Sequence, residues 1–178
     1  MGFYYMESKL LLKIKNYKEI RSISTKLHKD GKKIVMITGC FDLLHFGHAL
    51  FFEQAKKFGD ILIVSLGSDK TIKEYKGPGR PIYNQLTRAG LIASQTSVDF
   101  VVIAKERLDK QTGVDYKILI EKVKPDIFVL RNDDSAIEAT EKIIKKYGGR
   151  IKLVARARPA GIPYISTTDT IKKLSASR

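Results

Sequence analysis

The chain has 178 residues, of which 43% are hydrophobic and 29% charged, as in an ordinary soluble globular protein. Its formal net charge of +14 suits an anionic partner such as a nucleotide, a sugar phosphate, nucleic acid or a lipid surface. The single Cys40 excludes an internal disulfide framework and fits a reducing cytoplasm, which is the location we expect. No apolar run approaches the roughly 20 residues of a membrane span, and the first twelve residues lack the order of a signal peptide.

The first predicted elements are an extension and a helix. Residues 1–16 show no clear element, so we treat them as an N-terminal extension of a single domain that spans residues 17–178. Between residues 17 and 29, apolar side chains recur at helical spacing on one face. Asp30-Gly31 predicts the end of this helix, because glycine tolerates the left-handed backbone found there.

The most informative stretch joins a strand to a helix. The apolar run at residues 33–37 is typical of a buried parallel strand, and residues 47–58 predict an amphipathic helix. His45 and His48 project from the same side of the first helical turn, with Gly47 between them. A helix N-terminus attracts phosphate through its unpaired N–H groups, and a glycine lets a ligand approach the backbone closely. The pair could therefore donate hydrogen bonds to a polyphosphate.

Two other readings of the histidines stay open. Histidines at a loop–helix junction can be ordinary polar residues, and they can also bind zinc. Two of the three histidines in the chain fall in this one tetrapeptide at a strand-to-helix turn, which favours a functional role. A zinc site would need further ligands, yet the chain has one cysteine and no second cluster of histidine or cysteine.

The remaining elements repeat the alternation of buried strand and helix. This pattern predicts an α/β fold, a Rossmann-like doubly wound parallel five-stranded sheet with helices on both faces. In such sheets the ligand lies beyond the carboxyl ends of the strands, where the strand order reverses. The expected strands are 61–66, 99–103, 127–130 and 151–154, the expected helices are 84–96, 112–123, 133–147 and 168–174, and the glycine- and proline-rich stretch 70–80 is expected to be a loop.

Three polar stretches follow these strands or precede a helix. Lys73, Lys76 and Arg80 lie in the expected loop, which could close over a triphosphate or be a solvated basic loop. Residues 165–169 come directly before the last helix, where hydroxyls usually cap the helix but can also hold phosphate. Asp133-Asp134 could be a cap, a magnesium contact or a nucleotide contact, and Arg88 in the helix 84–96 could face either way.

The basic charge does not by itself indicate nucleic acid as the partner. The lysines are spread over helix positions that are expected to face solvent, and no arginine-rich run, RNA-binding aromatic signature or zinc finger is present. A catalytically silent basic module that binds nucleotide or RNA remains the alternative from a different functional class.

The chain resembles the cytidylyltransferase-like nucleotidyltransferases from about residue 13 to residue 174. Thr38-Gly39-Cys40-Phe41-Asp42, with His45, Gly47 and His48, is similar to the GCFD…HxGH signature of that family. Lys76–Pro81, with Arg88, and Lys124–Val129 resemble its heptose-1-phosphate branch, the domain fused to a sugar kinase in lipopolysaccharide-core enzymes. Ile165-Ser166-Thr167-Thr168 is similar to the late ISTT motif of the family.

The resemblance implies transfer of AMP or CMP from ATP or CTP to a sugar phosphate or similar small phosphate ester, with release of pyrophosphate. It also implies Mg²⁺ bound with the triphosphate, a homodimer, and no membrane partner. The catalytic residues would be His45, His48 and Lys76. Nucleotide binding would fall to Thr38, Gly39, Cys40, Phe41, Asp42, Gly47, Lys73, Arg80, Arg88, Arg131, Asn132, Asp134, Ile165, Ser166 and Thr167.

The chain departs from the heptose-1-phosphate pattern at several positions. Thr38 stands where asparagine is usual, Leu86 replaces an acidic residue, and residues 131–135 and 158–164 differ from the usual motifs. These changes leave the base and the acceptor open. A cytidylyltransferase of the glycerol-3-phosphate type therefore remains the alternative within the family.

Overall fold

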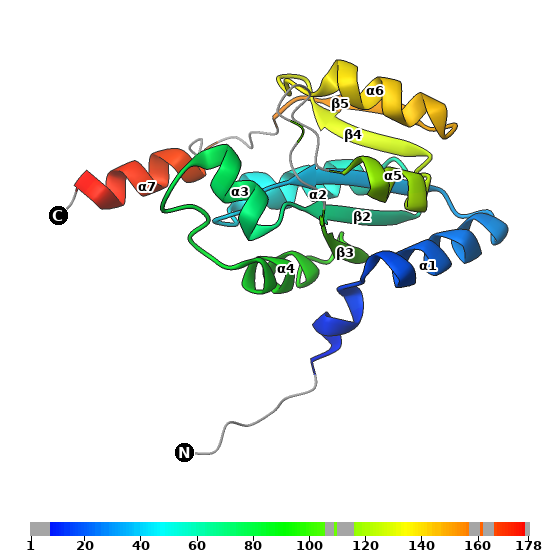
Figure 1. The fold of residues 1–178 in the computed structure, drawn as a ribbon, viewed down its shortest axis with the longest axis horizontal. Helices are drawn as coiled ribbons and strands as arrows, with labels where there is room; N and C mark the ends of the chain where they lie inside the picture. Colours follow the sequence, from blue (N-terminus) through cyan, green and yellow to red (C-terminus); the bar gives the residue numbers. More distant parts are fainter. Residues whose placement is uncertain (1–7, 106–108, 110–115, 157–160, 162–165, 177–178) are drawn as a thin grey trace.

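One sheet of five parallel strands runs through the molecule in the order β3-β2-β1-β4-β5 (Figure 1). The structure is a computed structural model, and it describes residues 8–105, 109, 116–156, 161 and 166–176. The strands are β1 (Ile34–Gly39), β2 (Ile61–Leu66), β3 (Phe100–Ile103), β4 (Ile127–Arg131) and β5 (Arg150–Val154). The predicted five-stranded parallel α/β architecture is confirmed.

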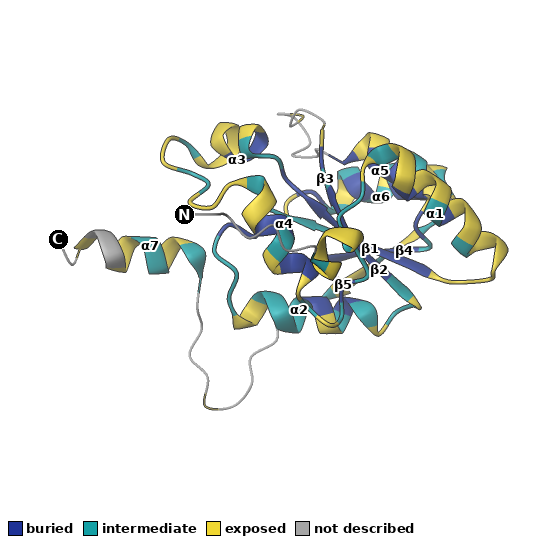
Figure 2. Cartoon of the chain, turned by 90° about the horizontal axis from the view of Figure 1, so that it is seen from below, coloured by how far each residue is buried: buried dark blue, intermediate teal, exposed yellow. Residues whose placement is uncertain are grey.

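Helices cover both faces of the sheet and bury two apolar cores. Strand residues of alternating parity point to opposite faces, so Val35 and Ile37 join one core while Ile34 and Met36 join the other. Figure 2 shows the buried positions along the strands and on the inward sides of the helices. The first core is covered by α2 (Phe46–Lys56) and α4 (Gln85–Ala93), and the second by α1 (Tyr17–Lys29), α5 (Lys117–Val123) and α6 (Ile137–Lys146).

Helix α3 (Asp69–Lys76) corrects the expectation of a loop over residues 70–80. Ser68 caps this helix by accepting a hydrogen bond from the Thr71 backbone N–H at 3.2 Å. Thr71 and Ile72 are buried against the body of the protein. The glycines and the proline that suggested a loop all follow residue 76, so only the segment after α3 has the irregular backbone that they favour.

Other boundaries moved by a few residues. Helix α4 ends at Ala93 rather than residue 96, and Leu86 in its first turn is exposed. Helix α6 begins at Ile137 rather than residue 133, because Asp134 forms a turn by accepting from the Ala136 N–H at 2.9 Å. The expected start of α5 at residue 112 lies outside the described residues, and α7 (Thr167–Ala176) stands at one end of the molecule, away from the sheet (Figure 1).

The segment before α1 forms structure that the sequence did not indicate. Residues Lys9–Lys13 form a 3₁₀ helix, η1, which packs against α4. Ile14 then forms a parallel bridge with Val101, and the Lys13 ammonium donates to the Val98 carbonyl at 2.7 Å. At least residues 9–14 are therefore attached to the edge of the sheet beside β3.

The strand order reverses between β1 and β4, and in parallel sheets of this kind the ligand crevice is expected beyond the carboxyl ends of the strands at such a switch point. The histidine loop follows β1 directly, and Arg131 ends β4. The two lie on opposite sides of this switch point. No helix in the described part of the chain is long and apolar enough to cross a membrane.

Two glycines provide a test of this packing. A Cβ on Gly149, between α6 and β5, would overlap the Pro125 carbonyl oxygen, whereas a Cβ on Gly90, within α4, meets nothing within 4 Å. We expect Gly149→Ala to destabilise the protein by about 1–3 kcal/mol. Gly90→Ala should stabilise it by about 0.5–1 kcal/mol, because alanine favours the helix. Urea unfolding of both variants measures these changes, and equal effects would contradict the close approach at Gly149.

Candidate active site

The backbone between β1 and α2 turns sharply around Phe41. Phe41 has a φ of +44°, which is rare for a residue with a side chain, and its ring is buried. The ring folds back beneath Gly39, where a Cβ would lie only 2.7 Å from Phe41 Cζ. It also makes edge-to-face contacts with Phe52 and His48. Phe41 and Gly39, both predicted to bind nucleotide, thus shape the loop and orient His48.

His45 and His48 stack on each other at the N-terminus of α2. Their ring centroids are 3.7 Å apart, and the His45 backbone N–H donates to His48 Nδ1 at 3.3 Å. A Cβ on Gly47 would lie 3.2 Å from the His45 ring, so a glycine leaves that ring room. Because Nδ1 of His48 accepts a hydrogen bond, a neutral His48 carries its proton on Nε2.

The pKa values of both rings are lowered from their ordinary value. Burial is the main cause for each, and it lowers the pKa of His48 to about 3. His45 next to it adds to the lowering at His48, and the guanidinium groups of Arg131 and Arg156 lower both values. The histidines are therefore neutral near pH 7 and act as hydrogen-bond donors rather than as cations.

The β4 side of the crevice carries two arginines held by one carboxylate. Arg156, just beyond β5, donates to Asp133 from Nε at 2.9 Å and from Nη2 at 2.8 Å. Arg131 Nε lies 3.5 Å from the other oxygen of Asp133. The hydrogen bond from Arg156 lowers the pKa of Asp133, which stays ionised. This cluster joins the ends of β4 and β5. Its positive charge lowers the pKa values of both histidines.

Sequence reasoning missed Arg156 and left the role of Asp133 open. Asp133 follows β4, which borders the switch point, and Arg156 follows β5, the next strand in the sheet, so their proximity becomes predictable only when the strand order is known. Asn132, a predicted nucleotide contact, is exposed, and its backbone N–H donates to Val154 O at 3.1 Å. Asp134 caps the turn before α6 through the Ala136 contact, so its carboxylate has a structural partner.

Asp42 ties the loop after α3 to the end of β1. Its carboxylate is buried and paired with Arg80, and it also accepts from the Ile82 N–H at 2.6 Å and the Tyr83 N–H at 3.3 Å. Arg80 is therefore held by a carboxylate and does not stand free above the site. Asp42 and Arg80, both predicted to bind nucleotide, meet each other in the structure.

Arg88 is fully buried and joins four segments. Its guanidinium donates to Cys40 O at 2.7 Å, Gly67 O at 3.0 Å and Asp69 Oδ1 at 2.7 Å, while Nε donates to Tyr83 O at 2.9 Å. The question of which way Arg88 faces is answered: it points inward. Through it the ends of β1 and β2, the start of α3 and the segment before α4 are fixed relative to one another. Cys40 contributes its carbonyl oxygen to this arrangement.

The other predicted residues fall into two groups. Lys73 and Lys76 are exposed on α3, and the Lys76 ammonium lies 4.4 Å from the Tyr75 ring centroid. Thr38 pairs with Ser65 in the sheet one residue before the turn. Neither Lys73 nor Lys76 takes part in the hydrogen bonds and ion pairs described above between the histidine loop and its neighbours.

The late motif reaches the histidine loop through α7. Ser166 caps this helix, accepting from the Asp169 N–H at 3.1 Å and donating to the Asp169 carboxylate at 2.6 Å. Thr167 donates to Leu43 O at 3.3 Å, two residues before His45. Ser166 and Thr167 therefore stand next to the predicted phosphate site with their N–H groups at a helix start. Ile165 lies outside the described residues.

Carboxylates at this site are occupied by arginines rather than gathered for a metal. Asp42, Asp69 and Asp133 pair with Arg80, Arg88 and Arg156, respectively. Among the residues that the structure describes, no three histidine, cysteine, aspartate or glutamate side chains come together as metal ligands. These three carboxylates thus serve as partners of the arginines in the described part of the site.

A helix that begins with a histidine pair at the switch point of a parallel sheet is an arrangement typical of nucleotide-handling α/β proteins. The model of the cytidylyltransferase-like family matches residues 36–178. The chain belongs to this cytidylyltransferase-like family, the nucleotidyltransferase class that its motifs predict.

Individual relatives agree with the family. The chain is 39% identical over 161 residues to the bifunctional protein HldE of Aliarcobacter butzleri, and 45% identical over 133 residues to that of Nitratiruptor sp.. These matches cover 90% and 75% of this chain but span only 31% and 27% of the two relatives. This chain thus corresponds to about a third or less of either relative.

Solved structures show the same fold. The lipopolysaccharide core biosynthesis protein from Thermoplasma volcanium matches 72% of this chain and 99% of its own, with 32% identity and a TM-score of 0.58. The pantoate-beta-alanine ligase from Francisella tularensis matches 91% of this chain and 76% of its own, with a TM-score of 0.60. At 19% identity, the second likeness concerns the fold alone.

The lowered pKa of His48 predicts an acid-sensitive fold. Below about pH 6.5 the His48 ring takes up a proton in the unfolded chain but stays neutral in the folded chain. The free energy of unfolding therefore falls as the pH decreases toward about 3. Between pH 7 and pH 5 this loss is about 2 kcal/mol. His48→Gln should lose less stability over that interval, as measured by urea unfolding at both pH values. An equal loss in both proteins would show that His48 is not held neutral.

Proposed function

We propose that the chain transfers a nucleoside monophosphate from a nucleoside triphosphate to a small sugar phosphate, as a heptose-1-phosphate adenylyltransferase does. The observation that carries this proposal is the neutral, stacked His45–His48 pair at a helix start, opposite the Arg131–Arg156 cluster. The relationship to the HldE proteins and to a lipopolysaccharide core biosynthesis protein supports a sugar phosphate as the acceptor.

The reaction suits these residues because it needs charge stabilisation rather than a nucleophile from the protein. An oxygen of the acceptor phosphate attacks the α-phosphorus, the bond from that phosphorus to the bridging oxygen breaks, and pyrophosphate leaves with the electron pair. The attacking phosphate is already ionised, so no base must remove a proton. The imidazole N–H groups of His45 and His48 donate to phosphate oxygens, and the arginines offset the negative charge that develops.

We further propose that Mg²⁺ accompanies the triphosphate and that Lys73 and Lys76 contact its phosphates. The metal supplies positive charge to the phosphate oxygens. Both lysines are exposed on α3, where Gly77, with a φ of +88°, ends the helix. The substrates of this reaction also support a cytoplasmic location.

Pyrophosphate release with Mg²⁺ tests the reaction. Each of ATP, CTP, GTP and UTP is paired with heptose 1-phosphate or glycerol 3-phosphate, and we expect release with ATP and heptose 1-phosphate. His45→Ala and His48→Ala should each lower kcat about a hundredfold or more, the scale for losing one preorganised donor. A folded variant that keeps full turnover would refute the role given to the histidines. Release only with CTP and glycerol 3-phosphate would move the chain to the alternative branch.

Two lysine variants, one inside the proposed site and one outside it, separate a specific role of Lys76 from the effect of overall positive charge. Lys76→Ala should lower turnover, whereas Lys57→Ala, at the end of α2, should not, because the Lys57 side chain is exposed and outside the proposed site. Lys56 is unsuitable as a control because it forms an ion pair with Asp99. If neither release nor triphosphate binding is seen and RNA binding weakens steeply with salt, the chain is the non-catalytic basic module instead.

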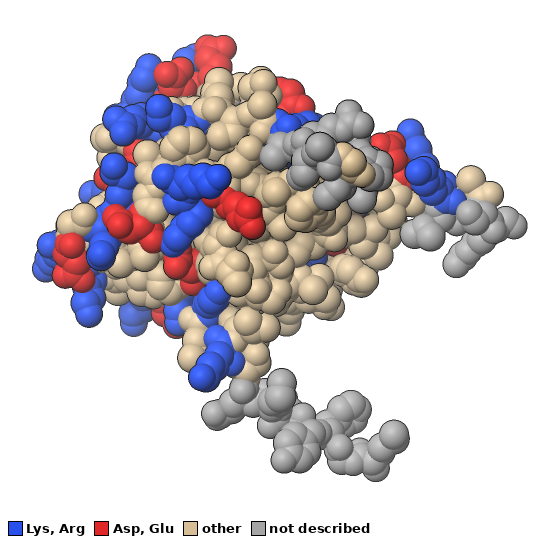
Figure 3. Space-filling view, turned by 180° about the vertical axis from the view of Figure 1, so that it is seen from behind, with Lys and Arg blue, Asp and Glu red and all other residues tan. Residues whose placement is uncertain are grey.

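We also propose that the chain is a homodimer that associates through η1 and α4. Leu11, Leu12 and Leu86 on these neighbouring elements are 61%, 68% and 66% exposed, and exposed apolar patches mark interfaces. Seen from behind, the molecule carries charged side chains crowded over one side and sparse over the rest (Figure 3).

Sedimentation equilibrium tests the dimer. Leu86→Lys should shift the protein toward monomer, because it places an ammonium group in an apolar contact. Leu153→Lys is the matched control, since Leu153 is 49% exposed on β5 at the opposite edge of the sheet. A monomeric wild-type protein, or equal effects of both variants, would refute the proposed interface.

A further inference from the structure

A hollow lies at the carboxyl ends of β2 and β3, on the side of β1 away from Arg131. It has a volume of about 540 Å³, within the range of small-molecule sites. Its wall includes residues from four segments: the chain before and within α1, the start of α3, the start of α4 and the end of β3. The side chains that matter for its chemistry are Lys15, Asn16, Glu19, Ser68, Gln85 and Lys105.

The hollow is on the same edge of the sheet as the histidines. Ser68 and Lys105 follow β2 and β3, so both lie at carboxyl ends of strands, as the histidine loop does after β1. The two regions are directly linked, because the Gly67 N–H donates to Gly39 O at 3.1 Å. Arg88 donates to carbonyl oxygens on both sides of this link. The hollow therefore begins one strand away from the histidine loop, at Ser68, and extends to the end of β3, two strands away.

The segment before α1 builds one wall of the hollow and is firmly held. The Lys15 N–H donates to Val101 O at 2.8 Å, next to the Ile14 bridge. Asn16 caps α1 by accepting from the Glu19 N–H, and the Glu19 carboxylate accepts from the Asn16 N–H at 2.8 Å. The Tyr17 hydroxyl accepts from the Lys105 N–H at 3.0 Å. These bonds attach the N-terminal segment to β3 across the mouth of the hollow.

The lining suits a polyhydroxylated ligand. Two ammonium groups and the amide NH₂ groups of Asn16 and Gln85 supply donors, and the Glu19 carboxylate supplies an acceptor, whereas the Ser68 hydroxyl and both amide oxygens already accept bonds within the protein. Sugar hydroxyls suit such a lining because each can donate and accept. Ile14, Ile103 and Ala104 supply the apolar remainder. The Lys15 ammonium and the Glu19 carboxylate stand 4.0 Å apart, too far for a strong hydrogen bond, so both have capacity for a ligand.

We propose that this hollow holds the sugar portion of the acceptor, with Lys15 and Lys105 selecting it, while the acceptor phosphate is directed toward the histidine loop. The inference rests on the proposed function, and it gives the segment before α1 a part in substrate specificity. The triphosphate would occupy the β1–β4 crevice, so the two substrates would approach from opposite sides of β1.

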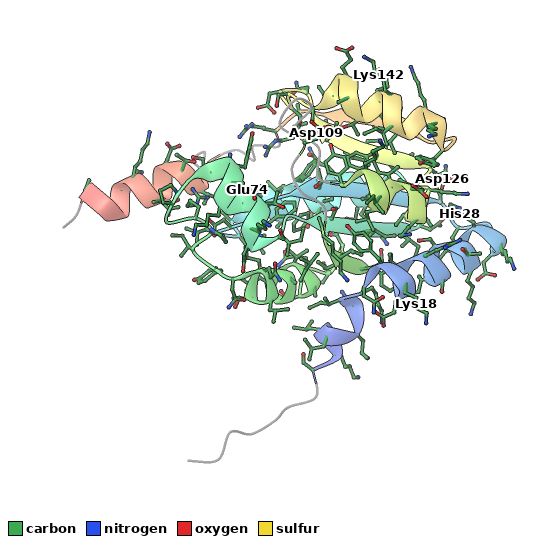
Figure 4. The ribbon with its side chains drawn as sticks, in the orientation of Figure 1. Lys18, His28, Glu74, Asp109, Asp126 and Lys142 are labelled. Carbon is green, nitrogen blue, oxygen red and sulfur yellow. The ribbon has the colours of Figure 1, made fainter. Side chains whose placement is uncertain are left out.

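Matched lysine variants test the assignment. Lys15→Met and Lys105→Met keep most of each side chain and remove its charge. Lys18→Met removes the same charge one turn along, from an exposed position on α1 that is not part of the lining (Figure 4). We expect Lys15→Met and Lys105→Met to raise the KM for heptose 1-phosphate about tenfold, with kcat and the KM for ATP nearly unchanged. The reason is that each variant loses a contact with the sugar that is equally strong in the ground state and the transition state. Lys18→Met should change none of these constants.

The outcomes separate this inference from the proposed function. If the wild-type enzyme turns over and Lys15→Met and Lys105→Met keep the wild-type KM for heptose 1-phosphate, the sugar site is elsewhere although the function stands. If the wild type shows no turnover, calorimetric titration with heptose 1-phosphate decides. Binding that is weakened by Lys15→Met and not by Lys18→Met supports the hollow as a sugar-phosphate site, whereas absent binding, or equal binding to both variants, overturns it.

Discussion

The buried guanidinium of Arg88 is the constraint on which the site depends. Removing a charge from water is costly unless the charge is fully paired, and here four acceptors from four segments surround it. Two of the acceptors are carbonyls just beyond β1 and β2, so these strand ends must stay in one relative position for the charge to be satisfied. The histidine loop starts from one of these fixed ends. Its geometry is therefore set before any ligand arrives.

The electrostatics of the crevice follow from this fixed geometry. Arg131 and Arg156 make the surroundings of the histidines cationic, and burial adds to the cost of protonating them. Neutral imidazoles donate hydrogen bonds without adding to the repulsion between the positive groups. Asp133 holds the two arginines while cancelling only part of their charge. A polyanion is the ligand that such a crevice would stabilise most, because it supplies the missing negative charge.

The sequence was sufficient for elements that local pattern determines and insufficient where distant residues meet. Continuous apolar runs located every strand, and the helix expected from residue 84 starts there, where Asn84 caps it by accepting from the Thr87 N–H at 2.9 Å. The loop expected over α3 was wrong because its glycines and proline belong only to the following turn. The Arg156–Asp133 contact joins the ends of neighbouring strands, and no local signal reports such a pairing. The inward direction of Arg88 depended in the same way on acceptors far along the chain.

The position of β1 in the sheet explains why one short loop could serve two substrates. With β4 on one side and β2 on the other, the loop after β1 borders both the arginine cluster and the hollow at the ends of β2 and β3. Residues 131–135, which depart from the heptose-1-phosphate pattern, lie on the β4 side with the arginines. Under the proposed arrangement those departures bear on the nucleotide, whereas choice of acceptor depends on the β3 side and the segment before α1. The two specificities could then change independently, because the histidine loop and Arg88 hold the reacting centre between them.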